Sequence, residues 1–218
     1  MKKVFILGAG GFARTTLDIY VDLSREGEVL GYLEDNCKRD GEILNGKPIR
    51  DVSHLNKFTT GDRPLLIAGI GTSKRRRFIE ELEQKGYHFD KVVHPSAIVS
   101  RWMKIGEGSI VTPGVIIGPN VEIGRHVILN YGCRVSHDDK IGNYVTISPG
   151  AEIMGSVTIG DEVFVGVNAT VIEKLKVGKG AIIGAGAVVT EDVPEMSLVA
   201  GVPAKVKKAY KSLEEKPW

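Results

Sequence analysis

The segment RVSHDDKIG, residues 134–142, contains a histidine followed directly by two aspartates. Histidine is the most common general base in enzymes, and an adjacent carboxylate can orient the imidazole and stabilise its protonated form. His137 and Asp138 therefore form a candidate base–acid pair. A surface histidine on a turn is the alternative. Whether Asp138 or Asp139 contacts the imidazole stays open from the sequence.

A strict repeat of six residues contains this segment. Every sixth residue from Val93 to Val189 is Ile, Leu or Val, which gives 17 aliphatic positions without an insertion. Neither the helical period of 3.6 nor the strand period of 2 produces this spacing. A short strand followed by a tight turn does, with the aliphatic side chain inside, a small residue at the corner and glycine in many turns. Three such strands predict a triangular coil of 18 residues.

This register places the candidate base on the outside of a coil, in line with a glycine. His137 lies two residues after inward-facing Val135, so its side chain should point outward. One coil further on is Gly155, the only glycine at this place in any hexad. A glycine there leaves room beside the imidazole and exposes a backbone amide. Asp139 occupies a corner position that is usually small or aliphatic, and we expect it to form a local hydrogen bond that shapes the turn.

The first half of the chain has the pattern of a small α/β unit. Residues 8–13, GAGGFA, are a variant of the dinucleotide fingerprint. Its glycines permit a tight turn and let backbone amides approach a phosphate at a helix N-terminus. The predicted elements are strands over 3–7, 29–33 and 65–70, a helix over 14–23 and a basic helix that begins near residue 73.

Candidate ligand-binding residues follow these strands. The acids after the second strand could accept hydrogen bonds from ribose or sugar hydroxyls. Only about half of a dinucleotide fold precedes the repeat, so a mononucleotide-linked ligand fits the available size better than NAD. A purely structural tight turn is the alternative. Residues 74–77, KRRR, could assist phosphate binding, but they are interpreted as a solvated helix face. The candidate residues are Gly8, Gly10, Gly11, Phe12, Glu34, Asp35 and Gly71.

Composition argues against several other classes. The chain has 218 residues, of which 42% are hydrophobic and 26% charged, and a formal net charge of +2. This balance does not require a nucleic acid or an anionic membrane as a partner. No window reaches the roughly 18 to 20 apolar residues of a membrane span, and the first residues are interpreted as a buried strand rather than a signal peptide. Two distant cysteines indicate a reducing compartment, so we expect a cytoplasmic protein.

The order of these features resembles the hexapeptide-repeat sugar acyltransferases, of the sialic acid O-acetyltransferase and UDP-4-amino-sugar N-acetyltransferase type. The resemblance also includes HPSAIVS (94–100) and GVPAK (201–205) and covers nearly the whole chain. It implies a mixed fold, with a small N-terminal Rossmann-like α/β domain (1–91) and a left-handed parallel β-helix (92–205). The left hand comes from the resemblance alone, since general crossover rules favour the opposite hand. We expect the tail (206–218) to be helical.

The same resemblance implies a site and a co-substrate. In this family the base is a histidine followed by an acid, with an asparagine seven residues earlier, and these positions carry His137, Asp138 and Asn130. The glycine amide that binds the acetyl carbonyl oxygen corresponds to Gly155. Acetyl-CoA is the implied co-substrate, no metal is expected, and family members are usually homotrimers with acyl-CoA sites between neighbouring prisms. The residues expected to contact acetyl-CoA are Gly155, Thr146, Gly166, Gly184 and Gly201.

Two positions depart from the family pattern. A second histidine, nine residues after the base in many members, is replaced here by Thr146, which removes an imidazole from the acetyl-CoA or substrate contact. A histidine in the glycine-rich turn of several members is replaced by Phe12, which affects sugar specificity. We expect His94 to be structural and His126 to be a surface or interface residue.

We therefore expect an acetyl-CoA-dependent N-acetyltransferase that acts on the amino group of a nucleotide-linked amino sugar in cell-surface glycan or polysaccharide biosynthesis. An O-acetyltransferase acting on a sugar or sialic acid hydroxyl is one alternative, and a non-catalytic β-helix scaffold subunit is another. A metal-dependent hydrolase on this scaffold would need three convergent histidines, and the spacing of His94, His126 and His137 does not fit. Nucleic-acid binding and membrane insertion are not expected.

Overall fold

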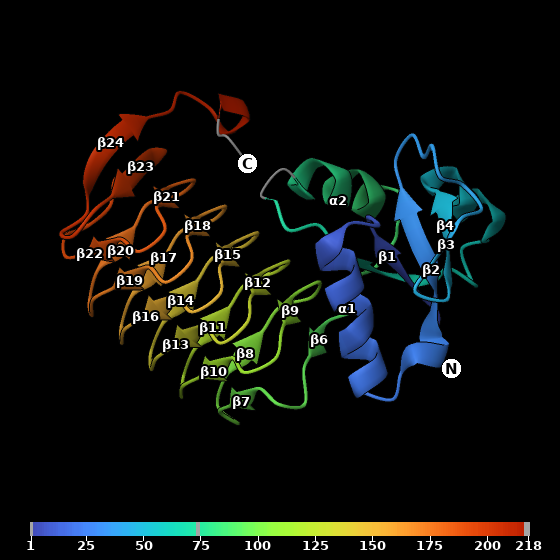
Figure 1. Ribbon diagram of the computed structural model, residues 1–218, viewed down its shortest axis with the longest axis horizontal. Helices are drawn as coiled ribbons and strands as arrows, with labels where there is room; N and C mark the ends of the chain where they lie inside the picture. Colours follow the sequence, from blue (N-terminus) through green and yellow to red (C-terminus); the bar gives the residue numbers. More distant parts are fainter. Residues whose placement is uncertain (1, 73–74, 216–218) are drawn as a thin grey trace. The chain divides into compact units, whose positions relative to one another are not determined.

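The computed structural model describes residues 2–72 and 75–215, and the chain divides into two units (Figure 1). The α/β unit comprises residues up to 71 together with 75–95, and the β-helix unit comprises the residues from 96 on together with Thr72. The predicted boundary, after residue 91, lies a few residues before the observed one.

The α/β unit is built on a five-stranded sheet with the order β3-β4-β2-β1-β5. All pairs are parallel except β3 with β4, which is antiparallel at the sheet edge. All four residues of β1 are buried, as expected for a central parallel strand that is covered on both faces. The strands are β1 (Val4–Leu7), β2 (Val29–Glu34), β3 (Ile43–Leu44), β4 (Lys47–Asp51) and β5 (Leu65–Ala68), and β6 (Val92–Val93) lies at the end of the unit.

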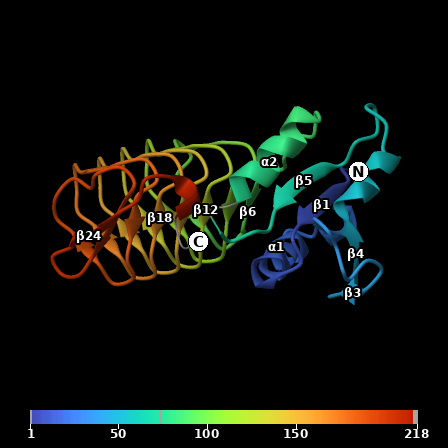
Figure 2. The ribbon, with the colours of Figure 1, turned by 90° about the horizontal axis from the view of Figure 1, so that it is seen from above.

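Two helices connect these strands on opposite faces of the sheet. Helix α1 (Gly11–Asp22) links β1 to β2. Helix α2 (Arg75–Gln84) links β5 to Phe89, which forms a parallel bridge with Leu66 on the edge of β5 that faces away from β1. The two connections run in opposite directions, so right-handed crossovers place α1 and α2 on different faces (Figure 2). The direction in which strands are added to the sheet therefore reverses beside β1. In open α/β sheets, ligands bind at the carboxyl ends of the strands at such a point, which here are the ends of β1 and β5. Helix α1 begins at Gly11, earlier than the predicted residue 14. The short turns of this unit are η1 (Glu26–Glu28) and η2 (Val52–Lys57).

The hexads form two-residue strands that stack in three parallel sheets (Figures 1 and 2). Each strand pairs with the strand 18 residues further on, as Ile117 does with Val135 and Val135 with Ile153. The predicted coil of 18 residues is therefore confirmed. The inward aliphatic side chains form the core, and Val135 is only 1% exposed. The sheets run β22-β19-β16-β13-β10-β7, β20-β17-β14-β11-β8 and β24-β23-β21-β18-β15-β12-β9.

The hexad strands are β7 (Ile98–Val99), β8 (Lys104–Ile105), β9 (Ile110–Val111), β10 (Ile116–Ile117), β11 (Glu122–Ile123), β12 (Ile128–Leu129), β13 (Arg134–Val135), β14 (Lys140–Ile141), β15 (Thr146–Ile147), β16 (Glu152–Ile153), β17 (Thr158–Ile159), β18 (Phe164–Val165), β19 (Thr170–Val171), β20 (Lys176–Val177), β21 (Ile182–Ile183) and β22 (Val188–Val189).

The end of the chain closes the β-helix with a hairpin. β23 (Ser197–Ala200) continues one sheet in parallel, and β24 (Lys205–Ala209) pairs with it antiparallel. The expectation of a helical tail was wrong for the described residues, because β24 is a strand and η3 (Leu213–Glu215) is a short 3-10 turn. Strand β24 covers backbone groups that the edge of β23 would otherwise leave unpaired. Neither helix of the described chain has the length and apolarity needed to cross a membrane.

Candidate active site

The turn between β13 and β14 carries the candidate base. The His137 side chain is 57% exposed, and its Nδ1 lies 2.8 Å from Oδ2 of Asp138. Asp138 has a φ of +60°, a left-handed conformation that aspartate tolerates in tight turns. The acid that contacts the imidazole is therefore Asp138 and not Asp139. Within the described residues, Nε2 of His137 has no hydrogen-bond partner, so this nitrogen can face a ligand.

The other oxygen of Asp138 is held by an asparagine that was not among the predicted site residues. Asn120 Nδ2 donates to Asp138 Oδ1 at 3.0 Å from the preceding coil. Because Asn120 lies 18 residues before Asp138, the coil register contained this signal. The hydrogen bonds from His137 and Asn120 lower the pKa of the Asp138 carboxyl, which favours its charged form.

Gly155 stacks on His137 in the next coil, as the register predicted. Strand β13 pairs in register with β16, and Ser156 N donates to the carbonyl of His137 at 2.9 Å. A Cβ atom at Gly155 would lie 2.5 Å from Cε1 of the imidazole, closer than real side chains approach. Only glycine fits beside the histidine in this arrangement. None of the described residues accepts a hydrogen bond from the Gly155 amide.

Asp139 is fully buried at the corner of the coil. Its Oδ1 accepts the N–H of Val157 at 2.8 Å, so the bond reaches the next coil instead of shaping its own turn as we expected. Its Oδ2 is buried and has no hydrogen-bond partner among the described residues. Burial raises the pKa of the Asp139 carboxyl to about 6.

Asn130 and Thr146 do not join the His137 turn within one chain. The Oδ1 of Asn130 accepts the N–H of Tyr131 at 2.9 Å, between β12 and β13. Thr146 lies on β15, is 4% exposed, and belongs to the sheet opposite the corner where β13 meets β14. A single chain therefore brings together His137, Asp138 and Gly155, but not Asn130 or Thr146.

The other glycines expected near acetyl-CoA lie at separate places of the β-helix. Gly166 and Gly184 follow β18 and β21, at a corner different from that of His137. A Cβ at Gly166 would lie 2.5 Å from the backbone nitrogen of Ala185, so close packing of successive coils already requires this glycine. Gly201, with a φ of +102°, makes the turn between β23 and β24.

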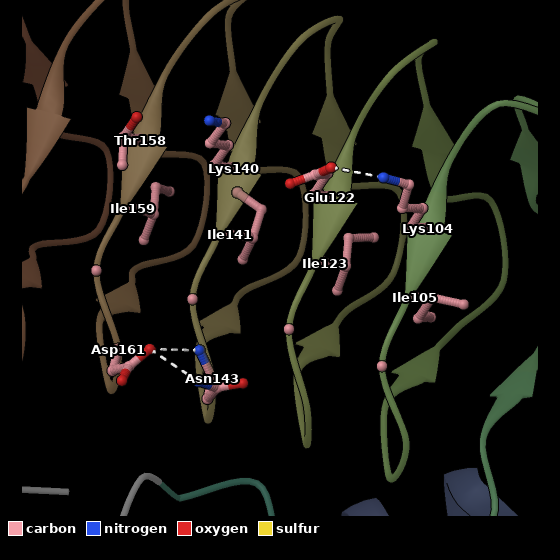
Figure 3. A pocket seen from close by; sticks show the side chains of 14 residues that line it. Lys104, Ile105, Glu122, Ile123, Lys140, Ile141, Asn143, Thr158, Ile159 and Asp161 are labelled. Carbon is pink, nitrogen blue, oxygen red and sulfur yellow. Dashed lines mark hydrogen bonds and ion pairs between the residues drawn. The ribbon is translucent and has the colours of Figure 1, made fainter.

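A groove of about 590 Å³ lies along strands β8, β11, β14 and β17, and β14 is the strand that follows the His137 turn (Figure 3). Its rim carries charged side chains, including Lys104, which pairs with Glu122 at 2.9 Å. On the other side, the backbone N–H and Nδ2 of Asn143 donate to Asp161 Oδ1 at 2.7 and 3.2 Å. His137 does not line this groove, so the base lies at the corner next to it.

In the α/β unit, the predicted glycines gather at the carboxyl ends of β1 and β5. Gly8 has a φ of +85°, which favours glycine, and Gly71 lies beside the side chain of Phe12. Gly10 precedes α1 without a side-chain cap, and no heavy atom lies within 4 Å of a Cβ built at Gly10 or Gly11. The N-terminus of α1 is therefore accessible, as anion binding by backbone amides requires.

Glu34 at the end of β2 is paired with an arginine that was not among the predicted site residues. Arg39 donates to Glu34 Oε1 at 2.6 Å, and the same guanidinium nitrogen lies 3.5 Å from the carbonyl oxygen of Ala9. Arg39 therefore spans from the acidic strand end to the glycine-rich turn. Asp35 is exposed beside this pair. The arrangement brings a fixed positive charge to the edge of the candidate phosphate site.

His94 and His126 are both buried. His94 is 7% exposed with Nε2 2.7 Å from Asp22, which agrees with a structural role. The expectation that His126 lies at the surface or an interface was wrong, because it is 1% exposed and stacks on Tyr144 with ring centroids 5.1 Å apart. No group of three or more His, Cys, Asp or Glu side chains in the described ranges is placed to hold a metal ion.

The basic run at the start of α2 is only in part a solvated face. Arg75 is 2% exposed, which contradicts that interpretation for this residue. Arg77 is mostly exposed and pairs with Glu81 on the next helical turn. Lys74 and Ser73 lie outside the described residues.

Known families match both halves of the chain, and a curated protein matches part of it. The family described as "PglD N-terminal domain" matches residues 3–82, and "Bacterial transferase hexapeptide (six repeats)" matches residues 140–173 and 156–191. The UDP-N-acetylbacillosamine N-acetyltransferase of Bacillus subtilis (strain 168) is 33% identical over 113 residues. That alignment covers 51% of each protein, so the chain spans about half the length of the curated relative it matches.

Two solved structures match over nearly their whole length. PerB from Caulobacter crescentus, in complex with CoA and GDP-perosamine, is 31% identical with a TM-score of 0.87, over 95% of this chain and 98% of that chain. The acetyltransferase domain of PglB from Neisseria gonorrhoeae FA1090, in complex with acetyl coenzyme A, is 31% identical with a TM-score of 0.86, over 94% of this chain and 98% of that chain.

The fold and these matches place the chain in the class of hexapeptide-repeat acyltransferases with an N-terminal Rossmann-like unit, and the predicted fold class, with its left-handed β-helix, is confirmed. The chain belongs to the sugar acyltransferase family of the sialic acid O-acetyltransferase and UDP-4-amino-sugar N-acetyltransferase type, as the resemblance predicted.

Proposed function

We propose that this chain is an acetyl-CoA-dependent N-acetyltransferase that acts on the amino group of a nucleotide-linked amino sugar in cell-surface glycan biosynthesis. The observation that carries the proposal is the exposed His137, bonded to Asp138 and stacked on Gly155. The names of the relatives point the same way, since they describe N-acetyltransferases of UDP- and GDP-linked amino sugars.

In the proposed reaction, His137 Nε2 takes a proton from the sugar amine as the nitrogen attacks the thioester carbonyl. Asp138 accepts the Nδ1–H at 2.8 Å and stabilises the imidazolium that forms. The amide of Gly155 donates to the oxyanion, a contribution of roughly 3 to 4 kcal/mol in comparable sites. Coenzyme A then leaves as the thiolate, and no covalent enzyme intermediate is needed.

The β-helix unit offers the surface for acetyl-CoA. The groove beside the His137 corner has the volume of a ligand site, and glycines are among the residues that line it. Asn130 and Thr146 lie away from the His137 turn within one chain. This separation supports a homotrimer in which a neighbouring prism completes the acetyl-CoA site with these residues. The glycines proposed along that site are Gly166, Gly184 and Gly201.

The α/β unit would hold the nucleotide sugar. The diphosphate would meet the amides of Gly10 and Gly11 at the N-terminus of α1. Arg39 would add a positive charge, and the carboxylates of Glu34 and Asp35 would accept hydrogen bonds from hydroxyl groups. We place the enzyme in the cytoplasm, which agrees with two cysteines that form no disulfide.

A hydroxyl acceptor is the second candidate, because it would need the same base and the same acyl donor. The amine is favoured since the named relatives act on amino sugars. A scaffold without catalysis is disfavoured, because a scaffold has no need for an exposed imidazole that is oriented by a carboxylate and stacked on a glycine.

The test is acetyl transfer from acetyl-CoA to UDP- and GDP-linked 4-amino sugars, followed by release of the CoA thiol. His137→Ala should lower kcat by about a hundredfold or more, the usual contribution of a general base. The matched control is Glu173→Ala, an exposed residue two coils further along the same column, which should behave like the wild type. Wild-type turnover by His137→Ala would exclude the assigned base, and activity only on sugar hydroxyls would favour the second candidate.

A further inference from the structure

We propose that Asp139 is a positioning residue for His137, whose buried carboxyl ties the turn of the base to the turn of Gly155 and sets the gap between the imidazole and the glycine amide. This inference rests on the proposed function, because it concerns the same base and the same amide. Asp139 is a buried acid next to the site, and it has no role in the proposed reaction itself.

The position of Asp139 is otherwise an aliphatic one. The residues directly before and after it in the same corner column are Val121 and Val157, which are both fully buried or nearly so. Asp139 is also fully buried. A carboxyl group in such a place costs free energy unless its oxygens are bonded, and Oδ2 has no partner among the described residues. Stability of the coil alone therefore does not account for an acid at this corner.

The bond that Asp139 does make connects the two halves of the site. Asp139 follows His137 by two residues, and its partner Val157 follows Gly155 by two residues. A second bond, from Ser156 N to the His137 carbonyl, joins the same two turns. The turn of His137 is therefore tied to the turn of Gly155 by two hydrogen bonds. A bond of 2.8 Å to the next coil thus controls how closely the base and the amide approach.

A serine at another corner shows that such a link does not need a carboxyl. Ser109 Oγ accepts the N–H of Val127 at 3.0 Å, also 18 residues on, and donates to the carbonyl of Gly124 at 2.9 Å. The hydroxyl is fully satisfied. Asp139 makes the same link but keeps a second oxygen next to the turn of the base, so it adds a titratable group where Ser109 adds none.

The charge of Asp139 is coupled to the site. Burial raises the pKa of its carboxyl to about 6, while the nearby His137 acts to lower it and Asp138 acts to raise it. The group that donates to its carboxyl is the backbone N–H of Val157, which is not titratable. Around neutral pH a negative charge therefore develops beside the base.

Two variants separate the effect of the hydrogen bond between Val157 and Asp139 from the effect of the Asp139 charge. Asp139→Val restores the aliphatic type of the column and removes the acceptor for Val157 N. It should lower kcat about tenfold, the scale of a small misplacement of catalytic groups, with both KM values within about twofold. Asp139→Asn keeps an acceptor oxygen and the volume, and should return kcat to near the wild-type value. Because it removes the titrating carboxyl, it should also change the pH profile of kcat/KM around pH 6.

Wild-type kcat in Asp139→Val, or a kcat in Asp139→Asn as low as in Asp139→Val, would overturn the proposal. If Asp139→Val does not fold, Asp139→Asn decides alone, and a pH profile identical to that of the wild type would overturn it. His137→Ala in the same assay separates the two proposals. If it stays active, the assigned base is wrong; if it is inactive while Asp139→Val is normal, only the role of Asp139 is wrong.

Discussion

A Cβ atom at Gly155 would lie 2.6 Å from Nε2 of His137, the ring nitrogen that is to take the proton. Gly155→Ala must therefore push the imidazole aside or separate the two coils. We expect kcat to fall about a hundredfold, because a misplacement near 1 Å is enough for such a loss. Turnover and the melting temperature should be measured together.

Gly61→Ala is the matched control, since no heavy atom lies within 4 Å of a Cβ at Gly61. It should leave both quantities near the wild-type values. Wild-type turnover in Gly155→Ala would show that the imidazole can move without consequence, and it would weaken the case for an amide and a base that act on one carbonyl.

Substitutions of Asp138 and Asn120 should lower kcat by different amounts. Asp138→Asn keeps a side chain that can accept the Nδ1–H but removes the charge that stabilises the imidazolium. We expect a loss in kcat of about tenfold to a hundredfold, which does not exceed the contribution of a general base itself. Asn120→Ala removes only the bond of 3.0 Å that holds the carboxylate, and it should cost less, about twofold to fivefold, the scale of one hydrogen bond. Asn56→Ala, at an exposed position, is the control. A larger loss in Asn120→Ala than in Asp138→Asn would contradict this order.

Counting along the repeat predicted much of this site. Since each strand pairs with the strand 18 residues away, side chains of one column can be placed without coordinates, and Gly155 was placed on His137 in this way. The same count in the other direction leads to Asn120. The sequence could not predict which of Asp138 and Asp139 contacts the imidazole. This contact depends on the left-handed φ of Asp138 and on the burial of the next residue.

Parts of the chain outside the repeat were less predictable. Arg39 comes from a polar loop whose path no periodicity fixes, so nothing in the sequence placed it against Glu34 and the glycine-rich turn. The tail was expected to be helical, yet β24 is a strand because the open edge of β23 offers backbone partners. His126 carries no charge partner in the sequence, and only its stacking on Tyr144 shows that it belongs to the interior.

Arg39 should determine the affinity for the nucleotide sugar. Arg39→Ala removes the positive charge beside the N-terminus of α1 and releases Glu34, so we expect the KM for the nucleotide sugar to rise about tenfold, the scale of a lost charge-assisted hydrogen bond. The KM for acetyl-CoA and kcat should stay near the wild-type values. Arg39→Lys should recover only part of the affinity, because an ammonium group cannot reproduce the planar fork of the guanidinium. Lys38→Ala is the neighbouring exposed control. An unchanged KM in Arg39→Ala would place the diphosphate elsewhere.

The buried carboxyl of Asp139 should also appear in the pH dependence of stability. Its pKa is raised to about 6 in the folded chain, against about 3.9 for an unperturbed aspartate, so the folded state holds the proton more tightly. The stabilisation from this group is fully present below about pH 4 and is lost as the pH rises through 6. Asp139→Asn lacks this titration. From pH 4 to 6 the free energy of unfolding of the variant, relative to the wild type, should therefore rise by up to about 1.4 kcal/mol per pH unit and then level off. Urea denaturation at fixed protein concentration, with Asp35→Asn as the exposed control, measures this difference, and a difference that stays flat across this range would contradict a buried, titrating Asp139.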